Sequence, residues 1–125
     1  MKSQRFGIEM EMTGISRKKA AEVIAAYFDT HEVYDGGSYD AYHVTDRQGR
    51  NWKVVSDASI HPVMRDGRSA SNLYKVEVVS PICHYEDIET IQELVRKLRR
   101  AGACVNRSCG IHIHVDAAPH SVKTL

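Results

Sequence analysis

Two segments of the chain alternate strictly between apolar and polar positions. One reads RFGIEMEM near the start, and the other reads CGIHIHVD near the end. Because successive side chains of a β-strand point to opposite faces, this alternation predicts two strands that are each apolar on one side. Glu9 and Glu11 would share the polar face of the first strand, and His112 and His114 the polar face of the second.

Two other segments repeat their apolar residues at the spacing of an α-helix. Apolar side chains recur three or four positions apart from about residue 17 to residue 29, and again from Ile88 to Leu98. This spacing predicts helices with one apolar stripe. The second helix has acidic residues in its first turns, basic residues in its last turn and Gly102 as its stop signal. That arrangement suits the helix dipole and the usual C-terminal glycine.

Three further strands are predicted at about residues 39–45, 52–56 and 73–80, and the first two form a hairpin. The strands at 52–56 and 73–80 each have one apolar and one more polar face, as in an antiparallel sheet that is covered on one side. We therefore expect a single α+β domain over residues 1–125, with an antiparallel sheet of about five strands and two helices covering one face. Pro119 predicts the start of another helix.

The polar face of this sheet would gather side chains that bind metal ions and anions. By strand parity these are Glu9, Glu11, Lys53, Asp57, Glu77, His112 and His114. Carboxylates and imidazoles so close together would disfavour each other without a cation. Glutamates with a histidine suit Mg²⁺ or Mn²⁺, and such ions commonly bridge protein carboxylates and substrate phosphates. Lys53 could hold an anionic oxygen, so the face points to phosphoryl chemistry, with ATP as a candidate.

Composition narrows the class of protein. Of the 125 residues, 42% are hydrophobic and 26% charged, which is typical of one globular domain. The formal net charge of +1 gives no general attraction for nucleic acid or an anionic membrane, and no apolar run is long enough to span a bilayer. Three cysteines without a C-x-x-C pair, and no signal-peptide pattern at the start, predict a cytoplasmic protein with reduced thiols.

A zinc site is the main alternative for the histidine strand. Cys104, Cys109, His112 and His114 carry suitable ligand atoms, and a glutamate of the first strand could serve as the base of a zinc-dependent hydrolase. The spacing C-x4-C-x2-H-x-H fits no ligand pattern that we can justify, and strand alternation places Cys109 across from His112. Either polar pair could also be a solvated strand face, but the two pairs with Glu77 on a third strand favour a metal–phosphate site.

Four short motifs occur in an order that resembles the amidoligase family. They read F-G-x-E-x-E from Phe6, S-D-x-S-I from Ser56, E-x-V-S-P from Glu77 and C-G-x-H-x-H-V from Cys109. The family belongs with glutamine synthetase and glutamate–cysteine ligase among the carboxylate–amine ligases. The resemblance implies a partial glutamine-synthetase-like fold. It also implies an ATP-dependent reaction in which a carboxylate becomes an acyl phosphate and an amine then displaces phosphate to form an amide.

The resemblance further implies roles for individual side chains. Divalent metal at the nucleotide phosphates would be held by the set Glu9, Glu11, Glu77 and His112. The catalytic and substrate-pocket set would be Asp57 and His114, joined by Lys53 from the same face. The expected substrates are a small-molecule or peptide carboxylate and an amine.

Members of this group are substantially longer than 125 residues. We therefore expect the chain to be either the N-terminal part of a longer amidoligase-like catalytic domain, the part that binds nucleotide and metal, or a natural short form. A non-catalytic binding module with a remnant ligase fold is the alternative. A truncated sheet would expose an edge or an apolar face, which favours a homo-oligomer.

Overall fold

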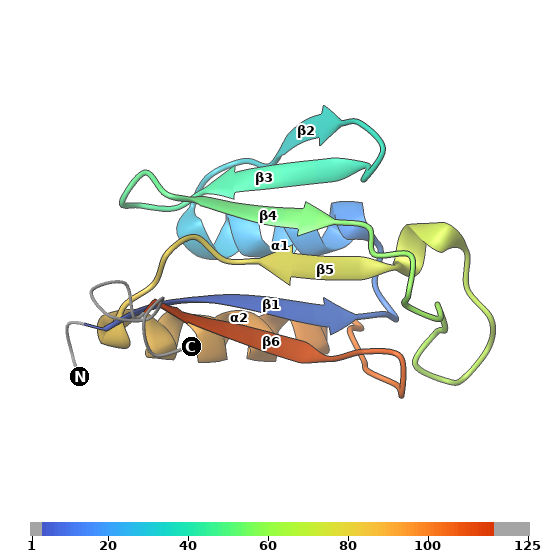
Figure 1. The fold of residues 1–125 in the computed structure, drawn as a ribbon. Coiled ribbons are helices and arrows are strands. Elements are labelled where there is room, and N and C mark those ends of the chain that lie inside the picture. Colours follow the sequence, from blue (N-terminus) through green and yellow to red (C-terminus); the bar gives the residue numbers. More distant parts are fainter. Residues whose placement is uncertain (1–3, 117–125) are drawn as a thin grey trace.

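The computed structural model describes residues 4–116, which form an α+β fold with a six-stranded antiparallel sheet in the order β2-β3-β4-β5-β1-β6 (Figure 1). The strands are β1 (Arg5–Met12), β2 (Val33–Gly36), β3 (Ala41–Thr45), β4 (Asn51–Val55), β5 (Val76–Val79) and β6 (Ile111–Asp116). The helices are α1 (Arg17–Phe28), α2 (Ile88–Arg100) and two short 3₁₀ turns, η1 (Asn72–Tyr74) and η2 (Tyr85–Asp87). None of the helices in this part of the chain is long and apolar enough to cross a bilayer.

Both long helices lie on the same face of the sheet (Figure 1). The core between the two layers is built from the apolar faces predicted by the sequence: Met10, Trp52 and Val78 from the strands meet Ile24 and Leu94 from the helices, all nearly inaccessible to solvent. The opposite face of the sheet has no helix over it within residues 4–116. Glu9, Glu11 and Glu77 stand on this face, where Glu9 and Glu77 are partly exposed and Glu11 is buried.

The predicted elements occur, with two differences in the sheet. Strand β2 was not predicted, because its four residues are largely exposed and carry no apolar alternation. The strand expected at 73–80 is shorter, since Ser71 caps the 3₁₀ turn η1 and the extended strand begins only at Val76. The helix expected from Pro119 lies outside the described residues.

A buried ion network joins α2 to the β3–β4 hairpin. The Arg50 guanidinium contacts Asp46 at 3.0 Å and Asp87, at the start of α2, at 2.9 Å. Asp46 is only 7% exposed and also accepts a hydrogen bond from the Trp52 indole at 3.0 Å. The Arg50 guanidinium holds the pKa of Asp87 below its usual range, so both charges remain paired at neutral pH.

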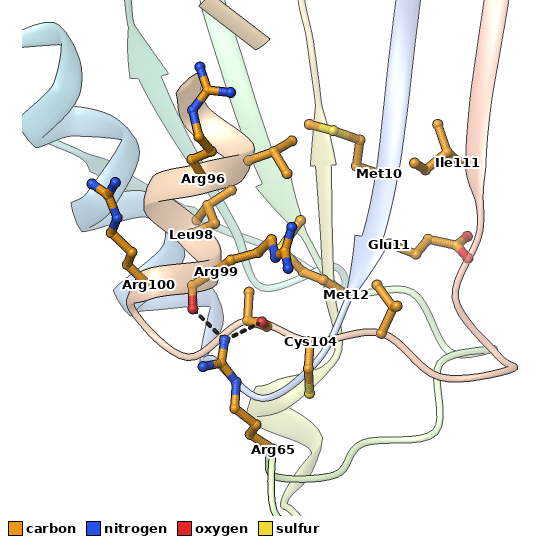
Figure 2. Close-up of a pocket in the computed structure, with 13 residues that line it drawn as sticks. Met10, Glu11, Met12, Arg65, Arg96, Leu98, Arg99, Arg100, Cys104 and Ile111 are labelled. Atoms are coloured by element: carbon orange, nitrogen blue, oxygen red, sulfur yellow. Dashed lines mark hydrogen bonds between the residues drawn. The ribbon is translucent and has the colours of Figure 1, made fainter. Parts of the chain in front are cut away.

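The helix layer does not reach the edge of the sheet at β6. Two grooves, of about 790 and 420 Å³, run beside α2. The larger is lined in part by Ile111, and the smaller by Ile113 and Val115. Figure 2 shows the larger groove, with Met10 and Ile111 on its sheet side and Arg96 and Arg99 on α2. These three β6 side chains are 56–65% exposed. The sheet is therefore wider than its two helices can cover.

Candidate metal centre

The acidic residues of β1 and the histidines of β6 lie on the same face of the sheet. Strand β1 is central, between β5 and β6. Its Glu9 is the register partner of His112 on β6, and its Glu11 is the partner of Glu77 on β5. The two residue pairs found in the sequence thus point into one region, as the strand alternation predicted.

Two groups of potential ligands can be drawn in this region. Glu9, Glu77 and His112 form one, and Glu11, Asp57 and Glu77 form the other. In each group the three ligand atoms lie within 4.8 Å of one another, close enough to coordinate a single ion. Because Glu77 belongs to both groups, its carboxylate lies between two candidate cation positions.

Glu11 is held by the chain segment that enters β6. The residue is only 8% exposed, and its Oε1 accepts a hydrogen bond of 2.8 Å from the Gly110 amide. Burial raises the pKa of Glu11, and a shared proton with Asp57 raises it further. Asp57 has the opposite tendency, because the hydroxyl and amide of Ser59 both donate to it and lower its pKa. Of the two carboxyl groups, Glu11 is therefore the one that binds a proton more readily.

Glu77 lies close to three other carboxylates. Burial raises its pKa, and the nearby charges of Glu9, Asp57 and Glu11 raise it further. A cation bound beside Glu77 would favour its charged form and offset this repulsion.

His114 and Lys53 lie beside the two ligand groups rather than within them. The His114 Nε2 is 3.5 Å from Glu9 Oε1, and the His112 Nδ1 is 3.7 Å from the same oxygen. Lys53 is exposed on β4, where it is the register partner of Val79, which in turn pairs with Glu9. Lys53 is thus two strands away from Glu9 on the same face.

The donor atoms fit a hard divalent cation. Four carboxylates and one imidazole offer oxygen-rich coordination, the type preferred by Mg²⁺ and Mn²⁺. Neither group of three ligands in residues 4–116 contains a cysteine. Cys104 instead lines the groove beside α2, and the Cys109 thiol contacts Asn106 Oδ1 at 3.7 Å. The arrangement of the described residues does not support a zinc site with these cysteines.

Two contributors to this site were not identified from the sequence. The Gly110 amide orients Glu11, and Ser59 orients Asp57. Ser59 belongs to the S-D-x-S-I motif, and its place two residues after Asp57 is that of a local side-chain turn. Gly110 carried a weak signal, since it directly precedes the histidine strand.

Comparison with protein families gives one match that covers nearly the whole chain. The sequence model of a family described as a putative amidoligase enzyme matches residues 2–125. Comparisons with curated proteins and with solved structures found no match. The motifs that suggested this family, from Phe6 to Val115, all lie within the matched range. The chain therefore belongs to the amidoligase family.

Proposed function

We propose that this chain is the nucleotide- and metal-binding part of an ATP-dependent carboxylate–amine ligase that acts through an acyl phosphate. The observation that carries the proposal is the position of Glu77, whose carboxylate is common to two groups of potential metal ligands. Two cations about one carboxylate suit the transfer of a phosphoryl group, because its charge is spread over several oxygens. Family membership supports amide formation as the overall reaction.

In this proposal, one ion would be held by Glu9, Glu77 and His112, and the other by Glu11, Asp57 and Glu77. Bound Mg²⁺ or Mn²⁺ would neutralise the phosphate oxygens and hold the γ-phosphate in place. Asp57, assigned to the substrate pocket from the sequence, is assigned here to the second ion because its carboxylate lies with those of Glu11 and Glu77.

The two remaining candidates would act on the substrates. A carboxylate oxygen of the first substrate attacks the γ-phosphorus, and ADP leaves. The amine then attacks the acyl carbon, and phosphate leaves as the amide forms. Lys53 would bind an anionic oxygen from β4. His114, whose side chain is 68% exposed beside Glu9, would accept the proton that the attacking amine loses. We place the protein in the cytoplasm, where ATP is available.

Thermal unfolding with and without Mg²⁺ and ATP tests the binding step. Because a ligand that binds only the native state stabilises it, Mg-ATP is expected to raise the Tm. Glu11→Gln keeps an acceptor for the Gly110 amide but removes the charge, so it is expected to abolish the Tm rise. Glu89→Gln, an exposed position on α2, is the matched control and should respond like the wild type.

Release of ADP in the presence of amino-acid carboxylates and amines tests the chemical step. A Tm rise with carboxylate- and amine-dependent ADP release supports the ligase. A Tm rise without any ADP release identifies a binding module instead. If Mg-ATP leaves the Tm unchanged, or if Glu11→Gln responds as fully as Glu89→Gln, the proposed site is wrong.

A further inference from the structure

The two candidate cation positions differ in how their ligands are held. The ligands of the first, Glu9, Glu77 and His112, all lie on strands, so sheet pairing fixes their separations. The second includes Asp57, which lies two residues beyond the end of β4 at Val55, in the connection that leads to η1. A ligand on a connection is placed only as precisely as the contacts that hold that connection. The geometry of the second position therefore depends on those contacts.

Hydrogen bonds from two side chains to the backbone of His61 join this connection to the segment that precedes β6. The Ser108 Oγ accepts from the His61 amide at 2.8 Å, and the Asn106 Nδ2 donates to the His61 carbonyl at 2.9 Å. The Ser108 hydroxyl also donates to the Asn106 Oδ1 at 2.6 Å, so the two side chains are bonded to each other. Both backbone groups of His61 are thus bound by one connected pair of side chains, and we call this arrangement the loop clasp.

The loop clasp links the two segments that carry or orient ligands of the second group. On one side, Asp57 precedes His61 by four residues in the same connection. On the other side, Gly110 follows Ser108 by two residues, and its amide donates to Glu11 Oε1 at 2.8 Å. The carboxylates of Asp57 and Glu11 have oxygens within 4.8 Å of each other. A shift of one segment relative to the other would change this separation, and the clasp opposes such a shift.

The connection is attached to the rest of the fold at other points as well. The Ile60 side chain lies in the interior, with only 2% of the residue exposed. The Thr13 hydroxyl accepts from the Val63 amide at 3.0 Å and donates to the Val63 carbonyl at 3.1 Å. These anchors remain when the clasp is opened, and His61 is exposed, so water can replace its lost hydrogen bonds. Opening the clasp should therefore loosen the position of Asp57 without unfolding the protein.

We propose that Asn106 and Ser108 are positioning residues for the second cation, because their clasp holds Asp57 close enough to Glu11 for both to bind one ion. This inference rests on the proposed function, in which a cation occupies that position. Neither residue is a ligand, and each acts through the backbone on either side of the clasp. Opening the clasp weakens the binding of the second cation and spares the first, whose ligands are fixed by strand pairing.

Titration with Mn²⁺ alone, followed through the EPR signal of the free ion, counts the bound cations and gives a Kd for each. The wild type is expected to bind two ions. Ser108→Ala removes the acceptor of the His61 amide and should raise the Kd of one ion about tenfold while the other stays unchanged. Ser108→Thr keeps the hydroxyl and should restore both affinities. Ser16→Ala is the matched control, because the Ser16 hydroxyl also accepts from a backbone amide, that of Lys19, but it caps α1 in the helix layer.

Amide hydrogen exchange measured by NMR without metal tests the clasp independently of any ion. Ser108→Ala should speed the exchange of the His61 and Gly110 amides, and Ser16→Ala should not. Unchanged exchange at Gly110 in Ser108→Ala overturns the inference. So does a wild type with two Mn²⁺ ions when Ser108→Ala binds both as tightly, when it loses both equally, or when Ser16→Ala loses the same affinity. A wild type that binds fewer than two ions contradicts the proposed function itself, and this inference falls with it.

Discussion

Replacing Glu77 by glutamine should have opposite effects on the stability of the protein without and with a bound metal ion. Glutamine keeps the size of the side chain but removes the charge that lies between Glu9 on one side and Glu11 and Asp57 on the other. Without metal, the substitution removes repulsion, and the protein should become more stable at neutral pH. With metal, it removes a ligand from both candidate positions, and the stabilisation by Mg²⁺ should disappear.

The size of the first effect follows from the geometry. Two unit charges 4.8 Å apart repel by about 3.5 kcal/mol at an effective dielectric constant of about 20. The net gain is smaller, because the Glu9 side chain is 34% exposed and water screens its charge. We expect the variant without metal to gain about 1 kcal/mol, or roughly 3–5 °C in Tm for a chain of this length.

The direction in which the pKa of Glu77 is shifted determines how the stability gained by Glu77→Gln changes with pH. The pKa of Glu77 is raised in the folded protein above its ordinary value of 4.5. A raised pKa means that the folded state binds the proton more tightly than the unfolded state. The contribution of Glu77 to stability is therefore fully present below about pH 4.5 and is lost as the pH rises through the folded-state pKa. The advantage of Glu77→Gln should accordingly grow from acidic to neutral pH.

Urea unfolding at several pH values, with chelator or with Mg²⁺, measures both effects. At a Mg²⁺ concentration about 100 times its Kd, the wild type should gain about 2.7 kcal/mol and the variant nothing. The order of stability should therefore reverse on adding Mg²⁺. Glu89→Gln controls for the loss of one negative charge and should follow the wild type. The reasoning is refuted if Glu77→Gln is less stable than the wild type in chelator at pH 7, or if both proteins respond equally to Mg²⁺.

Three other outcomes are expected. Asp46→Ala leaves the Trp52 indole without its acceptor and breaks the pair with Arg50, so urea unfolding should show a loss of about 3–5 kcal/mol. Gly14→Ala places a Cβ 2.5 Å from the Gly102 oxygen, whereas Gly67→Ala, also at positive φ, meets no atom within 4 Å. Gly67→Ala should cost about 1–2 kcal/mol and Gly14→Ala clearly more. Metal analysis should find no stoichiometric zinc, and stoichiometric zinc would favour the cysteine–histidine alternative.

The helices and the long strands could be predicted because their patterns are strong. Helix α2 combines an apolar stripe with oppositely charged ends, and it occurs over Ile88–Arg100 as the spacing indicated. The edge strand β2 could not be predicted in the same way, since its exposed residues have no core to face and therefore no alternation. The late start of β5 at Val76 follows from the 3₁₀ turn η1, which Ser71 caps, and apolar–polar alternation does not reveal such a turn.

The arrangement of the candidate site could be predicted only in part from the sequence. Strand parity correctly placed Glu9, Glu11, Glu77 and His112 on one face, because parity is a property of each strand alone. Which strands are neighbours is a property of the whole sheet. The central order β5-β1-β6 brings together segments that are about 70 and 100 residues apart in the chain, and only such pairing makes Glu77 common to two groups.

The central position of β1 also connects the site with the edge of the described sheet. Strand β1 contributes Glu9 and Glu11 and is bordered on one side by β6, the outermost strand of the described sheet. His112 and His114 therefore stand on the outermost strand, next to the candidate cations and next to the edge at once. Any strand that joins β6 would place its own side chains beside these imidazoles.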